Sequence, residues 1–418
     1  MDTSPKSNMV DPAAAKSHWT KVQRFIAGFY LVLLCVQYWP IEGYGTSMVK
    51  VPFLCLSPFI LIFAFRWSSC WKVAVCCFAC LAWKLAVAYF QSTPFRWVTL
   101  AYSVGFFFTY MMFYSLVHRG CFTVRNARTL LESLLWAYVI VLIIQQAYSL
   151  AGGSEWRLIN LVAARMSAMK CQSLALEPSH SGRILGAVFY SLLKLWEFDK
   201  GNRLSIGDLW RGHRWTMIAF LYAMISMQSA TAMFVLLLLL FYFFNWKYVL
   251  PIIAIFLLLP TIAEVTESNE LKRVMDVIDG ARTGNTEDVI KADDSGAYRV
   301  APMLNLLHAD YSDINLWIGH GIDTGYVIIE EDFAHSRENL LMGEILDIGI
   351  IGYLLSLFLV FSCAIHPVFS LPTLMFFFGV GGGTGNLAYH WGILMIFTIN
   401  SYFYNQKKRH LLTPADGS

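Results

Sequence analysis

An acid, an imidazole and a guanidinium occur close together just before one apolar segment of the chain. The stretch reads Leu176-Glu177-Pro178-Ser179-His180-Ser181-Gly182-Arg183. Pro178 and Gly182 predict a turn, and Ser179 or Ser181 can cap the helix that follows. We expect Glu177, His180 and Arg183 to cluster at one end of that helix, where they could bind anions and transfer protons. The alternative is a well-capped helix start with an arginine that reaches toward solvent.

Glycines and a further arginine mark a second region. Ser295-Gly296-Ala297-Tyr298-Arg299 is followed by Gly319-His320-Gly321-Ile322-Asp323-Thr324-Gly325-Tyr326. Glycine lets the backbone approach a ligand closely, and the planar guanidinium of Arg299 suits phosphate oxygens. Ordinary turn chemistry is the alternative explanation of such a loop.

A third polar stretch, Ala334-His335-Ser336-Arg337-Glu338-Asn339-Leu340, leads directly into an apolar segment that carries Glu344 and Asp347. These two acids are three residues apart, so they share one face of a helix. Ionisable groups within a membrane are costly and indicate function. Hydrogen bonds between neighbouring helices are the alternative.

The composition excludes an ordinary soluble domain. Of 418 residues, 57% are hydrophobic and only 14% are charged, against about 25% charged residues in soluble domains. The formal net charge of +3 leaves no basic surplus for a nucleic-acid partner. The nine cysteines lie mostly in apolar stretches or basic loops, so we expect neither a disulfide framework nor a metal or other cofactor.

Apolar segments long enough to cross a bilayer determine the predicted fold class. A membrane helix needs about 20 apolar residues. We therefore predict an all-α, polytopic membrane protein with about 12 spans, the least certain of which end at Gly381-Gly382-Gly383 or meet around Gln228-Ser229. The predicted spans are 22-41, 48-65, 71-90, 97-117, 130-151, 181-198, 214-229, 230-245, 247-264, 338-364, 367-383 and 386-404.

The distribution of Lys and Arg predicts the orientation. Eighteen of them fall on the side of the N-terminus, whereas the short connections on the other side hold only Lys50 and Arg96. Positive residues in short loops are retained in the cytoplasm. Both ends of the chain are therefore expected inside, with residues 1-21 and 405-418 as cytoplasmic tails, spans 1–9 within 22-264 and spans 10–12 within 338-404.

Two long outer segments remain, 152-180 and 265-337. Apolar residues of the first recur every three or four positions from Trp156 to Met169, which predicts a helix in the membrane interface or packed on the protein's own surface. The second is far too long for a passive connector. It is expected to form a large extramembrane subdomain.

Several short motifs occur in a fixed order along roughly residues 130-365. They are Leu174-Ala175-Leu176-Glu177-Pro178-Ser179, Gln228-Ser229-Ala230-Thr231-Ala232, Tyr298-Arg299, Ile318-Gly319-His320-Gly321, Glu338-Asn339 and Gly349-Ile350-Ile351-Gly352. This order is similar to that of the O-antigen polymerase and ligase superfamily. Members of the family, especially ligases, usually have a histidine directly before the asparagine, whereas this chain has Glu338 before Asn339, and this difference favours a polymerase over a ligase.

This resemblance implies a polysaccharide polymerase of the bacterial inner membrane, a glycosyltransferase of O-antigen or exopolysaccharide assembly. The growing glycan on undecaprenyl diphosphate would be the donor, and a lipid-linked repeat unit at the periplasmic face would be the acceptor. No metal or nucleotide sugar would be needed. Besides the lipid-linked oligosaccharide and the bilayer, a chain-length regulator and a flippase would be partners.

The residues fit such a transfer on physical grounds. Arginines can stabilise a departing diphosphate, and a histidine or carboxylate can accept the proton of the acceptor hydroxyl. We assign Arg299 and Arg183, followed by Arg337, to the diphosphate. His335 is the first choice of base, with Glu338 and Glu177 behind it. The remaining substrate-binding candidates are His180, His320, Tyr298, Tyr326 and Asn339.

Two other functions stay open at this point. An O-antigen ligase, which transfers the glycan to lipid A core, would share the fold. A secondary transporter would also be polytopic and would place polar groups such as Lys84, Glu344 and Asp347 within the membrane.

Overall fold

The computed structural model describes residues 12–37, 49–91, 97–153, 156, 158, 160, 170–243, 305–324, 343–365 and 371–412. This part of the chain is all-helical and contains no strand. Its helices are α1 (Pro12–Cys35), α2 (Lys50–Ala64), α3 (Trp67–Phe90), α4 (Trp97–His118), α5 (Val124–Leu150), α6 (Pro178–Lys200), α7 (Ile206–Ser226), α8 (Ala230–Tyr242), α13 (Ile314–Ile318), α15 (Gly343–Cys363), α16 (Leu371–Gly379) and α17 (Ala388–Leu412).

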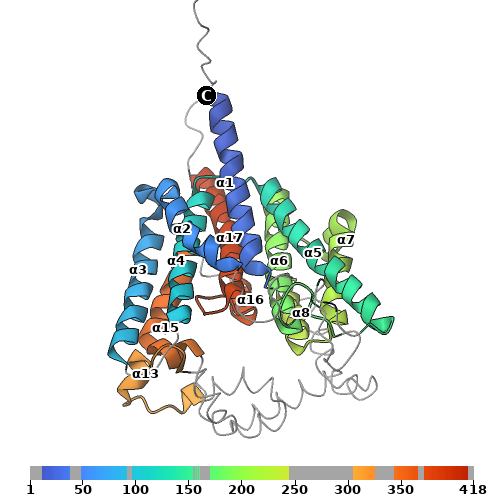
Figure 1. The fold of residues 1–418 in the computed structure, drawn as a ribbon. Helices are drawn as coiled ribbons and strands as arrows, with labels where there is room; N and C mark the ends of the chain where they lie inside the picture. The colour runs from blue at the N-terminus through green and yellow to red at the C-terminus, as the bar shows by residue number, and fades with distance from the viewer. Residues whose placement is uncertain are drawn as a thin grey trace, which may run out of the picture.

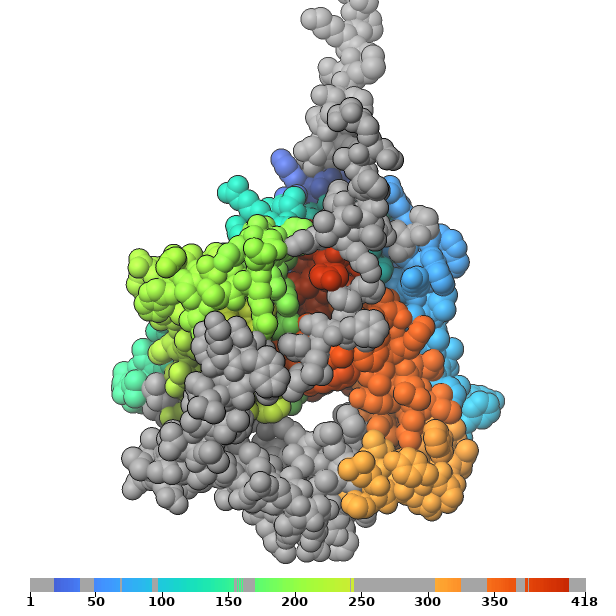
Figure 2. Space-filling model, turned by 180° about the vertical axis from the view of Figure 1, so that it is seen from behind, coloured from blue at the N-terminus to red at the C-terminus, as the bar shows by residue number. Residues whose placement is uncertain are grey.

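The helices form two groups with α17 between them (Figure 1). In one group α2 and α3 pack on α4, and α3 also packs on α15; in the other, α5, α7 and α8 pack on α6. Helix α17 contacts α4, α6 and α1. Seen from behind, residues of α16 and α17 (red) lie between the green helices of one group and the orange α15 of the other (Figure 2).

Polar side chains join α17 to both groups. The hydroxyl groups of Tyr110 on α4 and Thr398 on α17 are 2.9 Å apart. On the other side, Asn400 Nδ2 donates to Ser191 Oγ of α6 over 2.5 Å. Because apolar surfaces slide easily past one another, such paired groups fix how the helices align. Helix α17 therefore fixes the position of one helix group relative to the other.

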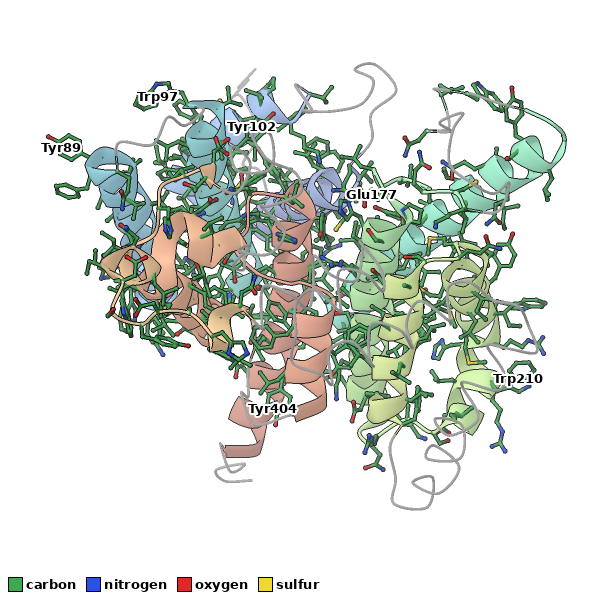
Figure 3. All side chains as sticks on the ribbon, turned by 90° about the horizontal axis from the view of Figure 1, so that it is seen from below. Tyr89, Trp97, Tyr102, Glu177, Trp210 and Tyr404 are labelled. Atoms are coloured by element: carbon green, nitrogen blue, oxygen red, sulfur yellow. The ribbon has the colours of Figure 1, made fainter. Side chains whose placement is uncertain are left out.

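Within the described residues, four helical segments are long and apolar enough to cross a membrane: Cys70–Phe90, Trp97–His118, Val124–Leu150 and Glu344–Cys363. Large aromatic side chains are exposed at the edges of the bundle, with Tyr89 at 84% and Trp97 at 75%. Figure 3 shows them at one edge and Trp210 at another, while Glu177 lies nearer the middle. An exposed apolar rim of this kind indicates a membrane protein.

The first turns of α1 and the last turns of α17 lie on the same side of the bundle, opposite α13 (Figure 1). We call these two sides the terminal side and the α13 side. The helices α1 to α8 overlap the first eight predicted spans in order, as helices, whereas predicted span 247-264 lies outside the described residues.

Two sequence expectations about helix extent are wrong. Among the described residues of predicted span 367-383, the helix Leu371–Gly379 ends before residue 383, because the chain turns at Gly381, whose φ of +69° interrupts a right-handed helix. The predicted helix within 152-180 cannot run through Asn160, whose φ is +59°. The side chain of Asn160 instead donates to the carbonyl groups of Ser173 and Ala175.

A buried polar network holds the segment that leads into α6. Gln145 of α5 donates through Nε2 to the carbonyl oxygen of Ser173 and accepts from the backbone N–H of Ser173 through Oε1. The Ser173 hydroxyl donates to Tyr138 O over 2.6 Å. At the end of α1, the backbone N–H of Gln37 donates to Leu174 O. Since unpaired buried polar groups are costly, these bonds determine where α6 begins.

Glycines bring α6 and α8 into close contact. Gly182 and Gly186 are four residues apart and face α8, where a Cβ at position 182 would lie 3.0 Å from Ala232 Cβ. A Cβ at position 186 would overlap Val235. Small residues at this spacing allow two apolar helices to approach closely. The first two motifs of the sequence, near Glu177 and near Ala232, therefore meet in space.

A second close approach joins the end of α13 to α15. Gly319 has a φ of +91°, and a Cβ there would overlap the carbonyl oxygen of Asp347. The backbone N–H groups of His320 and Gly321 donate to Leu346 O and Asp347 O. At these glycines the backbone therefore packs against the backbone of α15. This agrees with ordinary turn chemistry, one of the two interpretations of this glycine-rich stretch, and not with close approach of the backbone to a ligand.

We expect Gly319→Ala to lower the thermal midpoint of the detergent-solubilised protein by several degrees. The substitution combines left-handed strain of about 1–3 kcal/mol with the overlap at Asp347. Gly212→Ala is the matched control, because no atom lies within 4 Å of a Cβ at that position. Equal midpoints for the two variants would contradict this account.

Candidate functional site

The first turns of α6 position the predicted cluster. Pro178 occupies the first helical position and Glu177 precedes it in an extended conformation, with no side-chain cap. The predicted capping by Ser179 or Ser181 is therefore wrong. Ser179 donates to the Glu177 carboxylate over 3.1 Å, and Ser181 donates to the carbonyl oxygen of Gln172. Both hydroxyls fix the loop before the helix instead of its N–H groups.

The guanidinium of Arg183 lies at the centre of the site. Its Nη1 donates to the hydroxyl of Tyr389, at the start of α17, over 2.9 Å. Its Nε is buried and has no hydrogen-bond partner among the described residues. The guanidinium also passes close to Gly381, where a Cβ would lie 2.9 Å from Nη1. A guanidinium with a buried unused donor is suited to an anionic ligand.

Tyr389 holds two imidazoles beside this guanidinium. Its ring centroid is 4.6 Å from that of His180 and 4.3 Å from that of His390. The Nδ1 atom of His180 lies 3.1 Å from Gln37 Oε1, which ties it to α1. Arg183 and His180 both act electrostatically on His390. Aromatic packing thus brings three groups that can carry a positive charge around one tyrosine.

The loop between α16 and α17 forms the other wall of the site. It reads Val380-Gly381-Gly382-Gly383-Thr384-Gly385-Asn386-Leu387. Thr384 donates to Ser356 on α15, Trp391 donates to Gly385 O, and Ser103 of α4 donates to the Asn386 side chain. Although rich in glycine, the loop is therefore anchored on three sides.

Glu344 from α15 completes the cluster. A Cβ at position 385 would lie 3.1 Å from Glu344 Oε1 and would overlap His390 Nδ1. The carboxylate and the imidazole therefore converge on the same glycine. Lys84 on α3, whose side chain is 5% exposed, acts electrostatically on Glu344. Arg183, His180, Tyr389, His390 and Glu344 are called the Arg183 cluster below.

The cluster contains some but not all of the predicted site residues. Arg183 and His180 lie together in it. Glu177 lies at its edge as an exposed side chain bonded to Ser179. His320 lies apart, at the contact between α13 and α15. The predicted site residues outside the described part of the chain are Arg299, Arg337, His335, Glu338, Tyr298, Tyr326 and Asn339.

Sequence reasoning missed Tyr389, His390 and the glycine-rich loop. It treated Gly381-Gly382-Gly383 only as the end of a membrane span. The available signal was four glycines in five residues within an apolar region, followed after three residues by a tyrosine and a histidine. Such a break in an apolar pattern favours irregular backbone that lines a cavity.

The arrangement can bind an anion at Arg183 and move a proton near Gly385. The described residues contain no group of three His, Cys, Asp or Glu side chains placed to hold a metal ion. A cavity of about 320 Å³ lies at the other end of α6. Its ion pairs, Arg128 with Asp199 and Lys200 with Asp208, satisfy one another, which points to a structural role.

In comparisons with known proteins, no family model matches the chain and no curated protein matches it either. The Arg183 cluster therefore carries the functional conclusion through its geometry.

Proposed function

We propose that the chain is a polysaccharide polymerase, a glycosyltransferase that moves a growing glycan from undecaprenyl diphosphate to a lipid-linked repeat unit. The observation that supports this most is the guanidinium of Arg183, held by Tyr389 with its Nε unused among the described residues. In this reaction the leaving group is a lipid diphosphate. Its developing negative charge requires a preorganised cation near a lipid-accessible site.

The location of Arg183 within an apolar helical bundle supports a lipid-linked substrate. Arg183 is the sixth residue of α6, and its guanidinium bonds to Tyr389 of α17. A polyprenyl chain needs apolar surroundings, while its diphosphate needs a cation and hydrogen-bond donors. We propose Arg299 of the outer segment 265-337 as a second guanidinium for the same diphosphate, and Arg337 as a third.

The orientation belongs to the same proposal. With about 12 spans and both termini in the cytoplasm of a bacterial inner membrane, the α13 side faces the periplasm. Segment 265-337 then belongs to a large periplasmic subdomain. Lipid-linked repeat units delivered by a flippase reach the cluster from that side, and a chain-length regulator acts there.

A secondary transporter is the second candidate, because the buried Lys84 acts electrostatically on the Glu344 carboxylate within the helical bundle. Ionisable pairs at membrane depth are typical of proton-coupled transport. An O-antigen ligase remains the third, with lipid A core as acceptor.

Arg183→Ala is expected to lower polymer formation at least 100-fold, since it removes a cation at the leaving group. The measurement is the length distribution of surface polysaccharide, with the amount of variant in the membrane checked by immunoblotting. Arg211→Ala on α7 is the control, because that side chain is exposed. A normal ladder of chain lengths from Arg183→Ala would refute the assignment.

Tyr389→Phe is expected to reduce polymerisation about 10-fold while the protein stays folded. The ring contacts to His180 and His390 remain, but Arg183 loses the hydrogen bond that orients it, at a cost of about 1–2 kcal/mol. Tyr222→Phe is the matched control, because it removes a hydroxyl bond to Gln146 Oε1 between α7 and α5, away from α17 and the cluster. Equal activity of both variants would argue against the orienting role of Tyr389.

Deletion of the gene that encodes this chain, followed by analysis of the surface polysaccharide, distinguishes the three candidate functions. We expect lipid A core that carries a single repeat unit, as loss of a polymerase requires. Full-length polymer left on undecaprenyl diphosphate would identify a ligase. Unchanged surface polysaccharide would contradict both enzymes and favour transport.

A further inference from the structure

Gly385 marks a place that a carboxylate and an imidazole both approach. Glu344 Oε1 and His390 Nδ1 both point to the position that a side chain of residue 385 would fill. They come from α15 and α17, and in the described chain no other Glu and His converge on one glycine in this way. His390 is fixed by its backbone N–H, which donates to Leu387 O over 3.1 Å, and by its ring contact with Tyr389.

We propose that His390 is the catalytic base that accepts the proton of the acceptor hydroxyl, and that Glu344 is a positioning residue for its imidazole. This inference rests on the proposed function and adds to it a residue pair that sequence reasoning did not assign to proton transfer.

The position of the pair relative to Arg183 supports this role. Arg183 Nη1 lies at Gly381 and His390 Nδ1 lies at Gly385 of the same anchored loop. The leaving diphosphate and the attacking hydroxyl occupy opposite ends of one transfer reaction. The loop therefore holds a cation and an imidazole four residues apart, where the leaving diphosphate and the attacking hydroxyl of one donor would lie on either side of its anomeric carbon. Lys84 of α3 acts electrostatically on the Glu344 carboxylate.

Other described candidates are less well placed to act as the base. The Glu177 carboxylate is exposed and accepts a hydrogen bond from Ser179. His180 lies against Gln37 Oε1 through its Nδ1 atom. His390, in contrast, has Nδ1 at the same glycine as Glu344 Oε1, and a carboxylate near an imidazole can hold a histidine base in one orientation.

The step balances as a single displacement. The acceptor hydroxyl oxygen forms a bond to the anomeric carbon of the donor glycan, and its proton passes to the free ring nitrogen of His390. The bond between that carbon and the diphosphate oxygen breaks. Its electron pair leaves with undecaprenyl diphosphate, whose charge Arg183 stabilises. The imidazolium then releases its proton to solvent.

The test uses the full chain in lipid nanodiscs. Lipid-linked repeat units, extracted from a strain that lacks the chain, serve as donor and acceptor, and undecaprenyl diphosphate alone serves as the binding probe. The variants are His390→Ala, His390→Gln, Glu344→Gln, Arg183→Ala and His335→Ala. His118→Gln is the matched control, because His118 is the last residue of α4, where its ring stacks on Tyr114 and it is not part of the Arg183 cluster.

We expect His390→Ala to lower kcat about 100-fold or more while its affinity for undecaprenyl diphosphate stays within twofold of wild type. Added imidazole should restore part of that rate. Glu344→Gln should lower kcat about 10-fold with the same unchanged affinity. Arg183→Ala should instead weaken binding of the probe, and His118→Gln should change neither quantity.

The proposal is overturned if His390→Ala keeps more than a third of the rate, or if it loses probe binding in parallel with activity. It is also overturned if His335→Ala alone abolishes transfer. Where His390→Ala does not fold, His390→Gln decides by the same criteria, because an amide fills the space but accepts no proton at this step. A folded wild-type protein that transfers no glycan would refute the proposed function itself.

Discussion

The hydrogen bond between Arg183 and Tyr389 joins helices that are far apart in sequence, and much of the site depends on it. A guanidinium inside an apolar bundle is costly unless it is paired. Tyr389 supplies one acceptor and also holds His180 and His390 by ring contacts. The same residue therefore fixes a cation and two imidazoles. Because α17 also bonds to α4 and α6, the position of this tyrosine is set by the whole bundle.

The start of α6 is equally constrained from its other side. Gln145 and Ser173 form a buried network that fixes the residues just before the helix, and Gln37 ties them to α1. Buried polar networks of this kind specify one geometry, since any shift leaves groups unpaired. Arg183 is thus placed by the backbone that precedes it as well as by its own partner. This rigidity is what a preorganised anion site requires.

Glycine serves two different purposes in this protein. At Gly319 it allows one backbone to pack directly on another, so the space that a side chain would fill is occupied by Asp347. In the loop between α16 and α17, the positions that side chains of residues 381 and 385 would fill are approached by the side chains of Arg183, Glu344 and His390. The first glycine lets backbone pack on backbone, and the second group lets charged and ionisable side chains reach the loop.

The sequence by itself determined the helical class and the order of the helices, because an apolar segment of bilayer length has few ways to satisfy its backbone other than a helix. It also marked Arg183 and His180, whose spacing of three residues places them on one face of α6. It could not reveal Tyr389 or His390, since their meaning comes from a contact across more than 200 residues with Arg183. The sequence likewise could not distinguish the two roles of glycine. Only the tertiary structure decides whether backbone atoms or reactive side chains lie against a given glycine.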